Sequence, residues 1–166
     1  MPLPIGILCS SKACGGLELN VVRMADWLTR SGIKAVLIGS AHSEIRRRSR
    51  RAHLPFRAIG AMRKHFGLRA VFALRKTIRK NKITTLVVNT SVDLLHAMIA
   101  RIGLRPCVRI VYVQHMQIGV SKRDFYHTWL YRRIAAWISP LQFLTHQVVA
   151  RTRIAPDKIH EIPFGI

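Results

Sequence analysis

The stretch of sequence that decides the fold is "SSKACGGLELNVVRMADWL", residues 10–28. It follows an apolar run at residues 5–10 and leads into an amphipathic helix expected over residues 17–31; a second apolar run covers residues 34–40. This order predicts one β–α–β unit. Adjacent glycines allow tight backbone geometry and close approach of another group, and the free N–H groups at a helix start favour an anion. Gly15 and Gly16 therefore indicate either a plain strand-to-helix turn or a phosphate site.

The same alternation of strand-length and helix-length patterns continues along the chain. Residues 84–90 and 109–115 are continuously apolar, as is typical of parallel strands covered on both faces. Further strands are expected near residues 54–60, 136–139 and 158–164, and further helices over residues 64–80, 92–102, 122–137 and 141–153. The pattern predicts an α/β fold, a Rossmann-like doubly wound parallel sheet in a single domain over residues 1–166, with ligands at the carboxyl ends of the strands.

The charge balance is strongly basic. The chain has 28 Lys and Arg against 7 Asp and Glu, a formal net charge of +21, and its 49% hydrophobic content excludes a disordered tail. Such a surface binds phosphates on nucleic acid, anionic lipid or a phosphorylated glycan. The densest basic run, "EIRRRSRRAH" at residues 44–53, is expected to form a loop after the second strand. Nucleic-acid binding stays open on charge alone but is less favoured, because zinc-ligand spacing, an RNP-like motif and a clear helix-turn-helix pattern are missing.

The three cysteines, Cys9, Cys14 and Cys107, lack CxxC spacing and indicate a reducing compartment. Cys9 and Cys107 are expected to be core or turn thiols, and no metal site is evident. No run of about 18 apolar residues suggests a membrane span, and the N-terminus lacks the basic region of an export signal.

The helix expected over residues 64–80 has an unusual basic face. At about 100° per residue, Leu68 and Phe72 lie among its cations rather than on its core-facing arc. Such a pattern is typical of a helix in a membrane interface. The alternative is a solvated face with two covered hydrophobic residues. The candidate membrane residues are Leu68, Arg69, Phe72, Arg75, Lys76 and Arg79.

Three segments, in order along almost the whole chain, resemble one family. They are "SKACGGLELNVVRMADWLTRSGIKAVLIG", "QHMQIGVSKRDFYHTWLYRR" and "APDKIHEIPFGI". They are similar to the N-terminal domain of GT-B glycosyltransferases of family four. The resemblance implies one half of a GT-B fold: the acceptor-binding half of a retaining enzyme that transfers a sugar from a UDP-, GDP- or ADP-sugar, without a tightly bound cofactor. A donor-binding domain, in cis or in trans, would complete the active site, so we expect little or no transfer by this chain alone; a truncated remnant is the alternative.

The resemblance also assigns roles to residues at the predicted strand ends. Gly15 and Gly16 would border the donor diphosphate, and His115, the catalytic candidate, would face the sugar and acceptor. The alternative for His115 is a histidine hydrogen-bonded at a strand end. Glu18, in the first turn of its helix, suits the helix dipole and could also reach the acceptor. The acceptor candidates are Glu18, Ser91, Gln114, Lys122 and Arg123; a solvated helix face is the alternative for the last two.

The resemblance and the charge together favour a lipid-linked or phosphorylated glycan acceptor, such as lipopolysaccharide core. They also predict a cytoplasmic protein that is peripheral on the inner face of the cytoplasmic membrane, held there by its cations.

Overall fold

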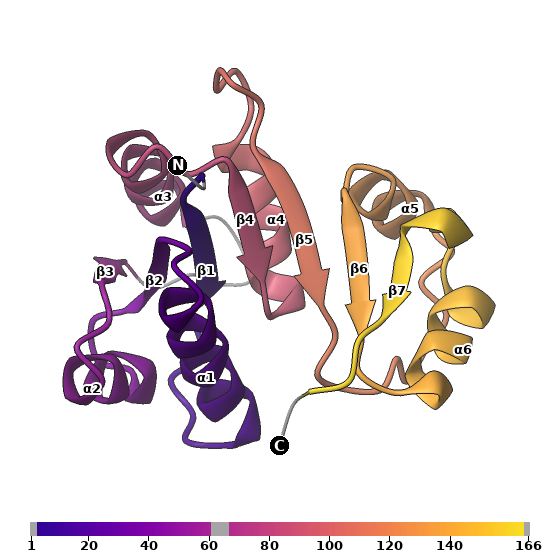
Figure 1. The fold of residues 1–166 in the computed structure, drawn as a ribbon. Helices are drawn as coiled ribbons and strands as arrows, with labels where there is room; N and C mark the ends of the chain where they lie inside the picture. The colour runs from indigo at the N-terminus through magenta and orange to yellow at the C-terminus, as the bar shows by residue number, and fades with distance from the viewer. Residues whose placement is uncertain (1–2, 61–66, 165–166) are drawn as a thin grey trace.

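The computed structural model describes residues 3–60 and 67–164. A single sheet of seven parallel strands, in the order β3-β2-β1-β4-β5-β6-β7, forms the centre of the molecule (Figure 1). The strands are β1 (Ile5–Cys9), β2 (Ala35–Ser40), β3 (Phe56–Ile59), β4 (Thr85–Val88), β5 (Arg109–Val113), β6 (Ala136–Ser139) and β7 (Ile159–Glu161). The chain starts in the middle of the sheet, runs to one edge and returns to build the other, which confirms the doubly wound parallel topology predicted from the sequence.

Helices cover both faces of this sheet. They are α1 (Gly16–Arg30), α2 (Glu44–Arg51), α3 (Leu68–Lys80), α4 (Ser91–Ala100), α5 (Phe125–Tyr131) and α6 (Gln142–Arg151), with a short 3-10 turn at Pro156–Lys158. The helices α1 and α2 pack on one face, and α3, α4, α5 and α6 pack on the other (Figure 1). All connections between neighbouring strands therefore leave the sheet at its carboxyl edge and return at the other edge.

Alternate residues of the strands supply two separate hydrophobic cores. In β1, Ile7 and Cys9 pack toward α1, whereas Leu8 packs toward α3 and α4. Burial raises the pKa of the Cys9 thiol to about 12, so Cys9 is a buried core thiol as its sequence context indicates. Burial on both faces explains why the strand segments are continuously apolar in the sequence.

The basic run at residues 44–53 is a helix for most of its length, so the expected loop is wrong. Ser43 caps α2 by accepting a hydrogen bond from the Arg46 N–H, and Ile45 and Ser49 are buried beneath it. With only one large apolar residue in eight, the segment shows no hydrophobic period from which a helix could be recognised.

Two other helices differ from their expected bounds. The helix expected over residues 122–137 is shorter in the structure, where α5 covers only Phe125–Tyr131. Lys122 lies in the preceding loop, and its backbone N–H donates to the Arg151 carbonyl. Of the helix expected over residues 64–80, residues 64–66 lie outside the described residues, and α3 begins at Leu68.

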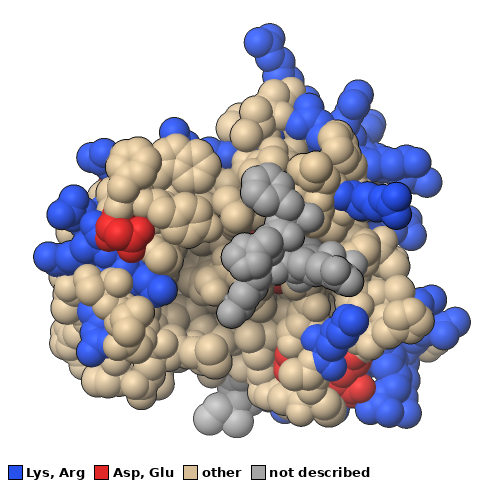
Figure 2. All heavy atoms as spheres, turned by 180° about the vertical axis from the view of Figure 1, so that it is seen from behind, with Lys and Arg blue, Asp and Glu red and all other residues tan. Residues whose placement is uncertain are grey.

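The basic side chains spread over much of the surface, including the regions of α2 and α3 seen from behind (Figure 2). On α3, Leu68 and Phe72 are 54% and 67% exposed. Arg75 has another partner, because its guanidinium donates to the carbonyls of Ala100 and Ile102 at the end of α4. Over residues 3–60 and 67–164, no helix has the length and apolar character needed to cross a bilayer.

Candidate functional site

The loop between β1 and α1 is held by Glu18. Its carboxylate accepts hydrogen bonds from the Gly15 N–H (2.9 Å between N and Oε2) and from the Ser11 hydroxyl. Burial by itself would raise the pKa of Glu18, but the hydrogen bonds from Ser11 and from the backbone N–H groups of Glu18 and Gly15 outweigh it and lower the pKa. Glu18 is buried and ionised, so it stabilises the helix start, the first of its two predicted roles.

The two glycines at this helix start differ in their surroundings. A Cβ at Gly15 would lie 3.3 Å from the Glu18 carboxylate, whereas a Cβ at Gly16 would meet no atom within 4 Å. Neither glycine has a positive φ. Packing within the described chain therefore does not require glycine at residue 16, and the open space beside it is available to another group.

His115 follows β5 at the carboxyl edge and is fixed by two neighbours. Its Nε2 lies 2.9 Å from the side-chain oxygen of Asn89, and its ring stacks on Phe164 with centroids 5.1 Å apart. The Asn89 amide nitrogen donates to the Leu8 carbonyl, which leaves the amide oxygen to accept. His115 therefore donates through Nε2–H, and the lone pair of a neutral ring lies on Nδ1.

Burial lowers the pKa of His115 from 6.5 to about 4, and the nearby Glu18 carboxylate opposes this shift without reversing it. The ring is neutral at pH 7. A neutral imidazole can accept a hydrogen bond from a ligand hydroxyl through Nδ1 while Nε2–H keeps its contact with Asn89.

This shift predicts a pH dependence of stability. The unfolded chain takes up a proton at His115 near pH 6.5 and the folded chain only near pH 4, so stability is lost as the pH falls through this window. At about 1.4 kcal/mol per pKa unit, the loss approaches about 3 kcal/mol by pH 4. Urea unfolding of the wild type and of His115→Gln at pH 7, 5.5 and 4 measures it. The variant should lack this part of the slope, whereas replacing the exposed His160 by Gln should retain it; equal slopes in all three proteins would contradict the prediction.

A cavity of about 300 Å³ opens beside His115 at the carboxyl edge. It brings together four residues that the sequence indicated: Ser91, Gln114, His115 and Lys122. The lining also includes Asn89 and Thr90 from the end of β4 and Leu17 from α1. Gly15, Gly16, Glu18 and Arg123 do not line it. Segments far apart in the sequence thus form one pocket, with a few polar side chains in a largely apolar lining, where a doubly wound sheet places its ligands.

Besides Glu18, two more of the predicted acceptor residues are engaged within the protein. The side-chain oxygen of Gln114 accepts from Trp137 Nε1 (3.1 Å) and from the Ser139 hydroxyl (2.9 Å), and its amide nitrogen donates to the Met116 carbonyl (3.0 Å). Gln114 is buried, so it holds the end of β5 against β6. The Arg123 guanidinium lies 3.4 Å from the Val149 carbonyl oxygen and is exposed.

The profile of Glycosyltransferase Family 4 matches residues 14–166, which include every residue lining this cavity. This chain belongs to Glycosyltransferase Family 4. Among curated proteins, no significant match is found. The family assignment agrees with the resemblance carried by the glycine loop, the segment after His115 and the closing segment.

Solved structures show the same fold in GT-B glycosyltransferases. A glycosyltransferase from Rickettsia africae ESF-5 matches with a TM-score of 0.82 at 13% identity, over 99% of this chain and 44% of that one. Anabaena Alr3699/HepE, solved with UDP and glucose, matches with a TM-score of 0.77 at 19% identity, over 99% and 45%. The lipopolysaccharide outer core galactosyltransferase WaaB matches with a TM-score of 0.71 at 14% identity, over 95% and 44%. The chain spans less than half of each and has the fold of one half of a GT-B enzyme.

Two further residues belong to this family-four site: Asn89 falls at a predicted strand end but was assigned no role from the sequence, and Phe164 was not selected at all. Asn89 orients His115, and Phe164 covers its ring. Asn89 ends an apolar run, which is a signal for a polar residue at the carboxyl edge, but its pairing with His115 depends on the adjacency of β4 and β5. Phe164 lies beyond β7, and only the folded chain brings it back to β5.

Proposed function

We propose that this family-four chain is the acceptor-binding half of a retaining glycosyltransferase that moves a sugar from a nucleotide-sugar to a lipid-linked or phosphorylated glycan of the cell envelope. The observation that carries the proposal is the cavity, with its few polar side chains, beside a neutral, oriented His115 at the carboxyl edge of the sheet. Lipopolysaccharide core is the preferred acceptor class, supported by the basic surface and by the fold shared with WaaB.

The donor in this proposal is a UDP-, GDP- or ADP-sugar, and UDP is the nucleotide in the Anabaena structure of the same fold. Gly15 and Gly16 would admit its diphosphate. The open space beside Gly16 supports this role, because a side chain there would fill the approach to the N–H groups at the start of α1. A donor-binding domain, in cis or in trans, would supply the remaining donor contacts.

In the proposed mechanism the protein positions the acceptor rather than forming bonds to it. Lys122 and Ser91 line the cavity and would bind acceptor oxygens. His115, as the catalytic residue, would contact the transferred sugar or the acceptor hydroxyl through Nδ1. The protein would act in the cytoplasm, held peripherally on the inner face of the membrane by the exposed face of α3.

Acceptor binding tests this function without a donor domain. Lipopolysaccharide core oligosaccharide titrated into the 166-residue chain should shift the ring C–H resonances of His115, and Lys122→Gln should weaken the affinity about tenfold by removing a charged contact. Arg30→Gln, on the outside of α1, is the charge-matched control and should bind like the wild type. An unmoved His115 resonance would overturn the proposal, and so would robust sugar transfer by this chain alone.

A further inference from the structure

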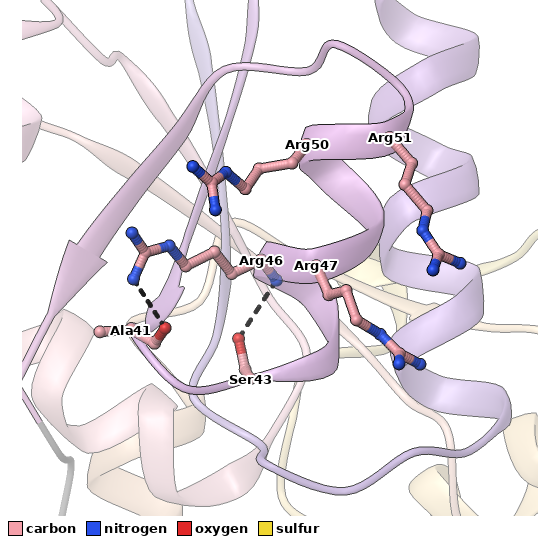
Figure 3. Close-up of a pocket in the computed structure, with 6 residues that line it drawn as sticks. All are labelled: Ala41, Ser43, Arg46, Arg47, Arg50 and Arg51. Atoms are coloured by element: carbon pink, nitrogen blue, oxygen red, sulfur yellow. Dashed lines mark hydrogen bonds between the residues drawn. The ribbon is translucent and has the colours of Figure 1, made fainter.

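A second cavity, of about 560 Å³, lies along α2 and is lined by four arginines (Figure 3). The side chains of Arg46 and Arg50 extend to one side of the helix, and those of Arg47 and Arg51 extend to the other. Ala41 and Ser43 complete the lining, and both lie just beyond β2. This cavity is therefore at the same carboxyl edge of the sheet as His115.

The arginines of this cavity differ in what holds them. Arg47 forms an ion pair with Glu44 (2.8 Å), and Arg46 donates to the Ala41 carbonyl (2.9 Å). Within residues 3–60 and 67–164, no acid forms an ion pair with Arg46, Arg50 or Arg51. Their charges thus remain available to an anion from outside the chain.

This arrangement is unfavourable for an isolated helix. Arg46 and Arg50, and likewise Arg47 and Arg51, are like charges four residues apart, a spacing that destabilises helices. Arg46 also places a cation in the first turn, where the helix dipole favours an anion. Glu44 in the first turn and its ion pair with Arg47 offset part of this repulsion. Arg46 and Arg50, in contrast, have no acidic partner among the described residues. Local choices that oppose the fold are typical of binding sites.

We propose that the α2 cavity binds a phosphate group of the acceptor, as a diphosphate or a phosphomonoester attached to the glycan; this rests on the proposed function. Arginine suits this ligand because its planar guanidinium donates two parallel hydrogen bonds to phosphate oxygens. The pair on one side of α2, Arg46 and Arg50, would hold one phosphate, and their position beyond β2 would leave the sugar portion at the carboxyl edge.

Calorimetric titration with inorganic pyrophosphate tests the cavity directly. The wild-type chain should bind it saturably, and Arg46→Gln/Arg50→Gln should weaken binding at least about tenfold. Arg79→Gln/Lys80→Gln, which removes the same charge from α3, should bind within about twofold of the wild type. An equal loss of pyrophosphate affinity in both double variants would show that only net charge matters and would overturn the proposal. Unchanged affinity in Arg46→Gln/Arg50→Gln would overturn it as well.

A second variant distinguishes weaker binding from a loss of folding. Arg50→Gln/Arg51→Gln removes two exposed side chains that make no hydrogen bond in the described structure, so it should melt like the wild type and still bind pyrophosphate more weakly. Wild-type binding by this variant would also count against the site.

Two further experiments identify the source of the phosphate and test this proposal separately from the proposed function. If the phosphate belongs to the acceptor, enzymatic dephosphorylation of the core oligosaccharide should lower its affinity for the wild type about tenfold and leave that of Arg46→Gln/Arg50→Gln unchanged, while both still shift the His115 resonance. Vesicle binding by this variant should be no weaker than that of Arg79→Gln/Lys80→Gln, which removes cations from the α3 docking face. A vesicle loss confined to the α2 variant would assign the cavity to lipid headgroups and overturn the acceptor assignment. Failure of pyrophosphate binding alone would leave the transferase proposal standing.

Discussion

Replacing Gln114 by Leu is expected to lower the free energy of unfolding by about 3 kcal/mol, because two buried donors lose their acceptor. Those donors are Trp137 Nε1 and the Ser139 hydroxyl, both on β6. Both residues are buried, so water replaces the lost acceptor poorly. Urea unfolding followed by tryptophan fluorescence measures the loss, which is a large fraction of the stability of a domain this size.

The exposed neighbour Gln117 is the matched control. Gln117→Leu removes the same chemical group from the rim of the same cavity and should change stability by no more than about 0.5 kcal/mol. A double-mutant cycle of Gln114→Leu with Trp137→Phe isolates the hydrogen bond, and we expect a coupling free energy of about 1 kcal/mol. Additive losses would show that Gln114 acts through something other than this contact.

Gln114 also marks a limit of what the sequence can show. Its position after an apolar run correctly places it at the carboxyl edge, where substrate-binding side chains gather. Its partner Trp137 is 23 residues further on, and only the pairing of β5 with β6 brings the two together. An acceptor role and a structural role leave the same local pattern, so the choice between them required the fold.

The sheet itself was predictable because its signal is local. Each parallel strand is buried on both faces, so β1, β2, β4 and β5 stand out as apolar runs, and the helices between them show their own period. The helix α2 was missed for the opposite reason, since Ile45 is its single large buried apolar residue and the arginines hide it. The residues of the site were predictable as a group, whereas their partners were not: Asn89 and Phe164 reach His115 only through strand order.

Replacing Leu68 and Phe72 together by Ser is expected to weaken binding to vesicles of anionic phospholipid about 100-fold. Each side chain is more than half exposed on α3, and inserting the pair into the interface stabilises the bound state by about 3 kcal/mol at about 25 cal/mol per Å² of buried apolar area. Arg69, Lys76 and Arg79 flank the pair and would meet the headgroups, at about 1 kcal/mol each and within a screening length of about 8 Å at physiological salt. Co-sedimentation with vesicles of increasing phosphatidylglycerol content measures the affinity.

The chain offers a closely matched control for this experiment. Leu141 and Phe143, at the start of α6, are 60% and 56% exposed, so Leu141→Ser/Phe143→Ser removes the same chemistry from another surface. This control should bind vesicles like the wild type if the α3 face is the docking surface, because hydrophobic insertion depends on which apolar side chains the surrounding cations bring to the bilayer. Arg75 should contribute less than Lys76 or Arg79, since its guanidinium already binds the end of α4. Unchanged binding by Leu68→Ser/Phe72→Ser would show that charge alone attracts the protein to the membrane. Equal weakening by both double variants would show that α3 is not the docking surface.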